Sequence, residues 1–106
     1  MLLTTTHSID GRRCQPLGLV HGTAVYSKNA VKDFGQAMKS LVGGELKSYT
    51  DLLELATTTA TERMTDAATA LGADAIIAVS YTSCNMIAEG GAEILASGTA
   101  VKFVDI

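Results

Sequence analysis

The last third of the chain, Leu71–Val104, constrains the fold most strongly. It predicts the end of a helix at Leu71, an apolar strand over Ala75–Ser83 and a returning strand over Glu93–Val104. Gly72 stands where a helix-ending glycine is expected, because glycine readily adopts the left-handed conformation that closes a helix. Two strands that return on each other predict an antiparallel pair. The rest of the chain is expected to cover this pair.

Two earlier segments favour extended structure. Leu2–Thr6 is short and β-favouring, and Leu17–Tyr26 predicts a strand that begins at or after Pro16, since proline donates no hydrogen bond to a sheet. Between them, Ile9–Gly11 predicts a tight turn, because Asp-Gly tolerates positive φ. The loop before the last strand, Asn85–Ala92, is long for a hairpin.

Two helices are predicted, one short and one long. Ala30–Leu41 repeats apolar residues at helical spacing, and Gly43 ends it. The longer helix, Ser48–Leu71, carries a mostly small apolar stripe at steps of three or four residues: Leu52, Ala56, Ala60, Met64, Ala67, Ala68 and Leu71. Its many threonines are mediocre helix formers, so packing is expected to hold this helix.

The predicted strands carry apolar residues on both faces. In Ala75–Ser83, one face holds Ile77, Val79 and Tyr81, and the other holds Ile76, Ala78 and Ser80. In Glu93–Val104, Gly98 marks a bulge or a tight contact, one face holds Leu95, Val101 and Phe103, and the other holds Ile94, Ala96, Ala100 and Val104. In Leu17–Tyr26, one face holds Leu17, Leu19, His21 and Thr23, and the other holds Val20, Ala24 and Tyr26.

Apolar residues on both faces bear on assembly. A sheet with helices on one side and water on the other alternates apolar and polar residues, and these strands do not. Two helices cannot cover both faces, so other copies of the chain are expected to supply the missing cover, across an interface that includes residues of the last strand such as Val101 or Phe103. The less specific interpretation is that alanine and serine make the outer face tolerable to water. The sequence thus predicts a two-layer α+β domain over residues 1–106 that forms a homo-oligomer.

Composition supports a single domain and excludes some partners. The chain has 106 residues, of which 18% are charged, fewer than the average of about 25%. Its net charge is −3 and it has no polybasic run, so nucleic acid is not an expected partner. No stretch has the length of a signal peptide core or a membrane span. Without an export signal, the two cysteines are expected to be reduced and the protein cytoplasmic.

Several motifs together resemble the YbjQ-like family, whose members are also called putative heavy-metal-binding domain proteins. They are the double glycine Gly43-Gly44, Tyr49, the run Ala70–Ile77 and the run Ser97–Val101. The resemblance covers nearly the whole chain. It implies a dodecin-like α+β subunit with a mainly antiparallel sheet of three to four strands, and a homopentameric ring. It implies no established activity.

Metal binding is the sharpest site hypothesis that the residues allow. Cys14, His21 and Cys84, with His7, are good soft-metal ligands. Their spacing forms neither CxxC nor HxxxH, so folding or ring symmetry would have to bring them together. The alternative is that the cysteines are small buried hydrophobic residues and the histidines are structural or exposed. A heavy-metal ion is therefore suggested by the family name alone.

Two classes of function remain open. The first is a non-enzymatic binding or assembly protein that holds metal or a small ligand between subunits. The second is an enzyme whose active site is composed between subunits, with Cys84 or Cys14 as nucleophile and a histidine as base. No nucleophile-elbow motif accompanies either cysteine. The positions of Cys14, His21 and Cys84 in the fold discriminate between these classes.

Overall fold

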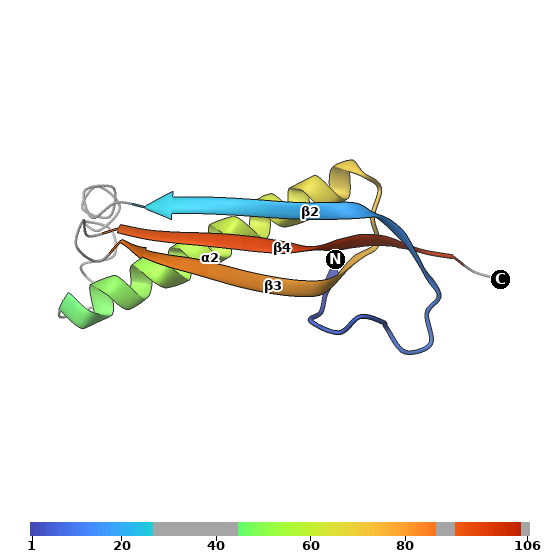
Figure 1. The fold of residues 1–106 in the computed structure, drawn as a ribbon, viewed down its shortest axis with the longest axis horizontal. Coiled ribbons are helices and arrows are strands. Elements are labelled where there is room, and N and C mark those ends of the chain that lie inside the picture. The colour runs from blue at the N-terminus through green and yellow to red at the C-terminus, as the bar shows by residue number, and fades with distance from the viewer. Residues whose placement is uncertain (27–44, 87–90, 105–106) are drawn as a thin grey trace.

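A computed structural model describes residues 1–26, 45–86 and 91–104 of the chain (Figure 1). Its elements are, in chain order, β1 (Leu2–Leu3), β2 (Cys14–Tyr26), α2 (Glu45–Ala70), β3 (Ala75–Met86) and β4 (Gly91–Phe103). The strands form one sheet in the order β1-β3-β4-β2. β1 runs parallel to β3, whereas β4 is antiparallel to both β2 and β3. The chain is therefore an α+β protein, as predicted, with a four-stranded mixed sheet.

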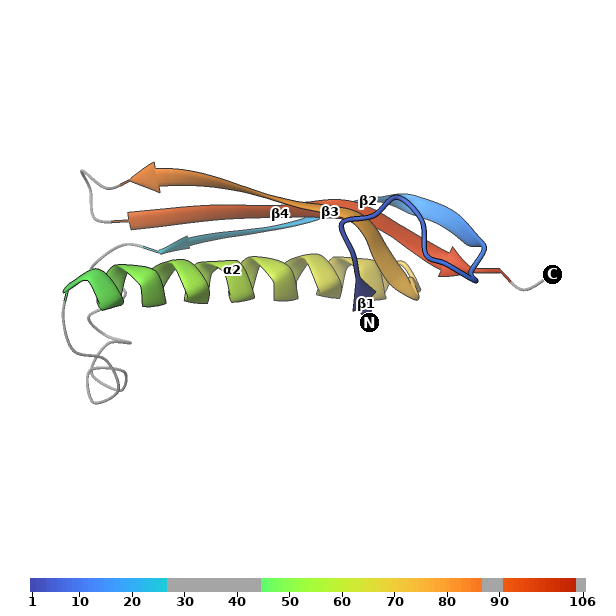
Figure 2. The same cartoon turned by 90° about the horizontal axis from the view of Figure 1, so that it is seen from below.

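The long helix matches its prediction closely. It was expected over Ser48–Leu71 and runs over Glu45–Ala70, along one face of the sheet (Figure 2). Gly72, with φ +78°, ends it as predicted. The Gly72 amide donates to the Thr69 carbonyl at 2.9 Å and the Ala73 amide to the Ala68 carbonyl at 3.1 Å, the pair of bonds that closes many helices. The shorter predicted helix, Ala30–Leu41, lies outside the described residues.

The predicted small stripe is the buried face of α2 except at its end, since Leu71 is 50% exposed and follows the helix. Every fourth residue is at most 4% exposed, in the series Leu52, Ala56, Ala60, Met64 and Ala68. The stripe packs on β2 and β4. The contact is closest at Gly22 of β2, where a side-chain methyl would overlap the Ala60 carbonyl oxygen and lie 2.5 Å from the Met64 amide nitrogen. Small residues therefore let the helix backbone meet the sheet backbone.

Two tyrosines fix the helix across the sheet. The Tyr26 hydroxyl on β2 lies 2.8 Å from the Thr59 hydroxyl, and the Tyr81 hydroxyl on β3 lies 2.8 Å from the Thr61 hydroxyl. Because β2 and β3 flank β4, these bonds hold α2 from both sides of the central strand. Other helix threonines donate to the carbonyl four residues earlier, as Thr57 does to Leu53 at 2.8 Å. The threonines are thus satisfied despite their weak helix propensity.

A β-bulge in β3 overturns the predicted faces of that strand. The register with β4 shifts between Ile77 and Ser80, so two residues of β3 face Gly98 of β4. Ala78 sits in the bulge with φ +53°. As a result Ile76 and Val79 are both buried, although alternation placed them on opposite faces. Gly98 makes the tight contact predicted for it, since a methyl there would lie 2.6 Å from Ile76 Cγ2.

The N-terminal segment pairs with this bulge. The Ala78 amide donates to the Thr6 carbonyl at 2.8 Å, and the Val79 amide donates to the Thr4 carbonyl at 3.0 Å. The Thr4 amide in turn donates to the Ile76 carbonyl at 3.0 Å. The β-favouring Leu2–Thr6 segment thus satisfies backbone groups that the bulge takes out of the β3–β4 ladder.

The remaining connections differ from prediction in detail. The Arg12 amide donates to the Ile9 carbonyl at 3.1 Å, which confirms the tight turn there. Strand β2 begins at Cys14, before Pro16, although it was expected at or after the proline. The proline is tolerated because β2 is an edge strand and its register shifts between Pro16 and Gly18. The hairpin strands extend to Met86 and resume at Gly91, so the loop is shorter than predicted.

Candidate functional site

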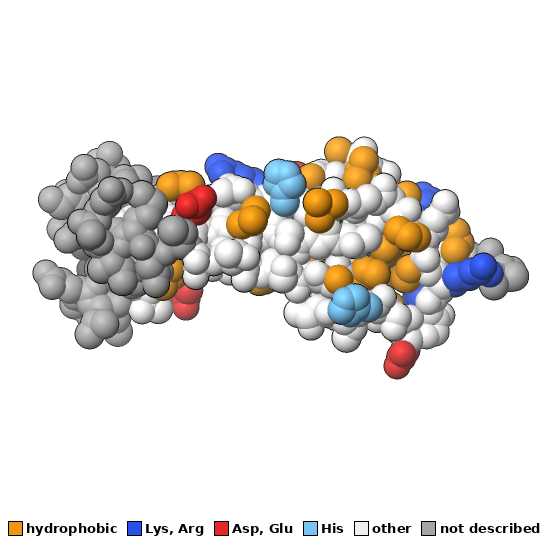
Figure 3. All heavy atoms as spheres, viewed as in Figure 1, with side chains coloured by type: hydrophobic (Ala, Val, Ile, Leu, Met, Phe, Trp, Pro, Cys, Tyr) orange, Lys and Arg blue, Asp and Glu red, His pale blue; other side chains and the backbone are white. Residues whose placement is uncertain are grey.

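The open face is the face of β2, β3 and β4 opposite α2, and it carries the most exposed apolar side chains of the sheet. On β2, Val20, Gly22 and Ala24 are buried toward α2, so the residues between them point the other way. Leu19 and Val25 on β2 are 75% and 59% exposed, and Leu95 on β4 is 37% exposed. Figure 3 views this side of the molecule and shows apolar side chains scattered over it. The predicted β2 faces are therefore confirmed from Leu19 onward, whereas Leu17, which was predicted on the face of Leu19, packs against the core because the register shifts between Pro16 and Gly18.

A row of polar side chains crosses the middle of the open face. His21 on β2 is paired in register with Ser97 on β4, and Ser97 is paired with Ser80 on β3. The two serine hydroxyls lie 3.2 Å apart. His21 is exposed, and Ser97 is half-buried. The row places an imidazole beside two hydroxyl groups, flanked along β2 by exposed Leu19 and Val25.

The end of the open face where β4 terminates is covered by the chain itself. The Arg12 guanidinium carbon lies 4.6 Å from the centre of the Phe103 ring, and the Val104 amide donates to the Arg13 carbonyl at 2.9 Å. Val101 is 1% exposed. Val101 is thus buried within the single chain and offers no side-chain surface to a partner.

The structure does not bring the predicted metal ligands together. Cys14 and His21 lie on the same strand, seven residues apart, which corresponds to about 23 Å in an extended strand. Cys84 is paired in register with Glu93, whereas Cys14 is paired with Phe103, so the two cysteines lie at opposite ends of β4, about 33 Å apart. That separation also excludes a disulfide between them within one chain.

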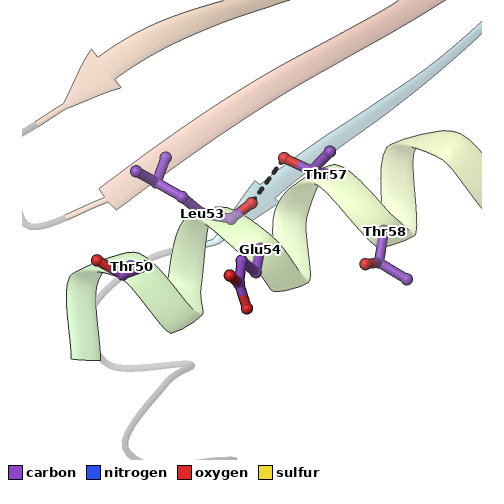
Figure 4. A pocket seen from close by; sticks show the side chains of 5 residues that line it. All are labelled: Thr50, Leu53, Glu54, Thr57 and Thr58. Carbon is purple, nitrogen blue, oxygen red and sulfur yellow. Dashed lines mark hydrogen bonds between the residues drawn. The ribbon is translucent and has the colours of Figure 1, made fainter. Parts of the chain in front are cut away.

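Two hollows of the described surface carry no such ligands either. One lies along α2, and all five of its labelled side chains come from that helix (Figure 4): Thr50, Leu53, Glu54, Thr57 and Thr58. A second lies at the N-terminal segment and is lined by Leu2, Thr4, Thr6, Ser8, Ile9 and Asp10. The lining residues of each hollow include one carboxylate, Glu54 in the first and Asp10 in the second, and no cysteine or histidine. Among the residues whose side chains the structure describes, 1–26, 50–83 and 91–104, no three His, Cys, Asp or Glu side chains are grouped to hold a metal ion.

Comparison with known proteins places the chain in a family. The YbjQ model, described as "Putative heavy-metal-binding", matches residues 1–104. The chain belongs to the YbjQ family. The UPF0145 protein of Thermotoga petrophila is 49% identical over 107 aligned positions, which cover 100% of both chains. The UPF0145 protein of Clostridium novyi is 43% identical over 104 residues, covering 98% of this chain and 100% of that one.

A solved structure supports the fold alone. The crystal structure of a protein of unknown function from Pediococcus pentosaceus, assigned to the DUF74 family, has a TM-score of 0.67 and covers 98% of each chain. Its sequence identity to this chain is 14%, so it bears on architecture and not on activity. In the described part of the chain, no helix has the length and hydropathy needed to cross a membrane.

The family's description names heavy-metal binding, and the described side chains of one chain do not form a group of three possible ligands. Cys14, His21 and Cys84 carried the site prediction, and no two of them converge within one chain. The feature that sequence reasoning placed elsewhere is the exposed apolar surface, which was expected near Val101 or Phe103 and lies around Leu19 and Val25. The sequence contains an indication of this exposed surface, because the segment Leu17–Tyr26 has no charged residue.

Proposed function

We propose that this YbjQ-family chain is a non-enzymatic subunit of a homo-oligomer, in which the open face packs against other copies. The assembly holds its small ligand or metal between subunits. The observation that carries the proposal is the exposure of Leu19 and Val25, at 75% and 59%, on a sheet whose other face is packed on α2. Burying such side chains stabilises an assembly by roughly 25 cal/mol for each Å² of apolar surface removed from water.

The amount of exposed surface supports the same proposal. The chain exposes 6924 Å², whereas a compact monomer of 11.0 kDa is expected to expose about 5,600 Å². Its radius of gyration is 16.5 Å, against about 13 Å for a compact domain of this length. The excess surface exceeds the roughly 800 Å² that each partner buries in a standard interface. An elongated subunit with this much extra surface is suited to association.

The β2 edge supports association as well. β2 is the edge strand of the sheet, 13 residues long, and its segment Leu17–Tyr26 carries no charged residue. Charged side chains are a usual protection of edge strands against pairing with another chain. Within the chain, the Arg63 guanidinium donates to one edge carbonyl, that of Thr23, at 2.6 Å. The long edge and the open face therefore meet along β2 and form one continuous candidate interface.

The family resemblance supplies the number of copies in this proposal, which is five in a closed ring. A ring buries a face-and-edge surface of this kind on every copy, and closure prevents open-ended filaments. The interface is centred on Leu19, Val25 and Leu95, and Val101 has no part in it because it is buried within the chain.

One observation favours an enzyme as the second candidate. The row His21, Ser97 and Ser80 places an imidazole in register beside two hydroxyl groups, which is the pair of groups used in nucleophilic catalysis. A neighbouring subunit would have to supply the group that orients His21 and the donors that stabilise the intermediate. Hydrolysis of an activated ester that disappears in Ser97→Ala, with the mass of the assembly unchanged, would favour this candidate over the first.

Sedimentation of a charged open-face variant tests the main proposal. Leu19→Lys places a charge in the centre of the interface and is expected to shift the protein toward the monomer. Thr58→Lys is the matched control, since Thr58 is exposed on the helix side of the molecule. The control is expected to sediment as the wild type does. If Leu19→Lys sediments like the wild type as well, the open face is not the interface.

A further inference from the structure

We infer that no heavy-metal ion is held by two of Cys14, His21 and Cys84 of one chain, so that a soft-metal site built on these residues draws its ligands from different copies. The first part rests on the geometry of the single chain. The second part rests on the assembly proposed above. The family's description names heavy-metal binding and does not say where the ligands lie.

The chain contains only four groups of this kind: His7, Cys14, His21 and Cys84. A metal ion sits about 2.0–2.3 Å from each thiolate or imidazole atom that binds it. With both side chains fully extended, the Cα atoms of two such ligands are at most roughly 13 Å apart. The pairs among Cys14, His21 and Cys84 can be judged against this limit, because the register of their strands is described.

The three residues on the long strands are too far apart. Cys14 and His21 are separated by about 23 Å along β2. His21 is paired in register with Ser97, and Cys84 is paired with Glu93. Ser97 and Glu93 are four residues apart on β4, so His21 and Cys84 are separated by about 13 Å along the strand direction. The two also lie on opposite sides of β4, which adds two strand spacings of about 4.8 Å across the sheet.

His7 lies outside the strands of the sheet. It follows Thr6, whose carbonyl accepts from Ala78 at the outer edge of β3. His21 lies on β2, at the opposite edge of the sheet. Figure 3 shows the two histidines of the chain as separate groups on this side of the molecule. Cys84 lies six residues beyond Ala78 along β3, about 20 Å from the level of His7.

A second copy of the chain can bring together possible metal ligands that lie far apart within one chain. His21 lies on the open face, and Cys14 begins the same edge strand, so both belong to the surface proposed to meet other copies. Symmetry repeats each of them on every subunit. Ligands that are far apart along one chain can therefore face each other across an interface, where two or more would complete a site.

Cobalt(II) titration of the full chain under reducing conditions tests the inference, with thiolate-to-cobalt absorbance as the readout. The variants are Cys14→Ser, Cys84→Ser, His7→Ala and His21→Ala. Light scattering on the same samples reports the mass. We expect no thiolate band in protein whose mass equals one chain, and thermal melts that coincide with and without a chelator.

Mixing the variants separates ligands of one chain from ligands of several. If two single variants each abolish a band in the assembly, refolding them together is expected to restore a fraction of it, because intact ligands then meet across interfaces. Failure of the mixture to restore any of the band would overturn the inference, as would a band in the monomer that two of the Cys14, His21 and Cys84 variants each abolish. A monomeric protein without a band leaves this inference standing and contradicts the proposed assembly, so the two failures are distinguishable.

Discussion

The two faces of the sheet are built from the same strands but are completed in different ways. The inner face is closed by α2, whose alanine stripe lets backbone meet backbone at Gly22. The open face carries Leu19, Val25 and Leu95 with no element of the described chain packed over them. Packing among the described residues therefore covers one face only. We propose that other copies of the chain cover the second face.

The largest effect is expected at the inner face, from Gly22→Ala. The added methyl would overlap the Ala60 carbonyl and lie 2.5 Å from the Met64 amide nitrogen, and backbone atoms cannot move aside as side chains do. We expect the free energy of unfolding to fall by about 3 kcal/mol, the upper end of overpacking costs. Urea denaturation measures the loss. Gln15→Ala, an exposed position on the same strand, is the control. Equal stability of the two variants would show that helix and sheet are not in backbone contact.

A similar but smaller loss is expected from Ala60→Leu. Ala60 is fully buried in the centre of the stripe, so the larger side chain overfills the contact at a cost of about 1–3 kcal/mol. Thr58→Leu adds comparable bulk at an exposed position of the same helix and is expected to change stability by no more than about 0.5 kcal/mol. Thermal melts of both variants provide the measurement. A melt of Ala60→Leu within a degree or two of wild type would mean that the stripe is not the buried face.

The smallest effects are expected at the two tyrosines that tie α2 to the sheet. Tyr26→Phe removes the half-buried hydroxyl contact with Thr59 and is expected to cost about 1 kcal/mol. Tyr81→Phe removes the exposed contact with Thr61 and is expected to cost less, because water replaces the lost partner. Urea denaturation of both variants gives the difference. A larger loss for Tyr81→Phe would show that the β3 side of the helix contact is the more buried one.

The inner face of the sheet is the part of the fold that the sequence predicts best. The helix stripe was predictable, because small residues recur at every fourth position from Leu52 to Ala68, and helical geometry places them on one side. The strands of the hairpin and the helix-ending Gly72 were predictable for similar local reasons. Local patterns thus specify the inner face well.

The errors arose where the fold departs from strict alternation. The bulge at Ala78 moves Val79 to the buried face. The pattern of apolar residues does not predict a positive φ at an alanine, so the bulge could not be predicted from it. The cover of Val101 comes from packing within the single chain, which the sequence of β4 does not reveal. The distances between Cys14, His21 and Cys84 could not be predicted, because they depend on the strand register; the metal hypothesis itself stays a prediction.

Light scattering of the wild-type protein at micromolar concentration tests the central claim most directly. If other copies complete the open face, the mass is a multiple of the 11.0 kDa chain, and the proposed ring predicts five times that value. A mass of two chains would agree with a covered open face but would contradict the five-membered ring. A mass of 11.0 kDa would contradict the account, because Leu19 and Val25 would then face water in the working protein.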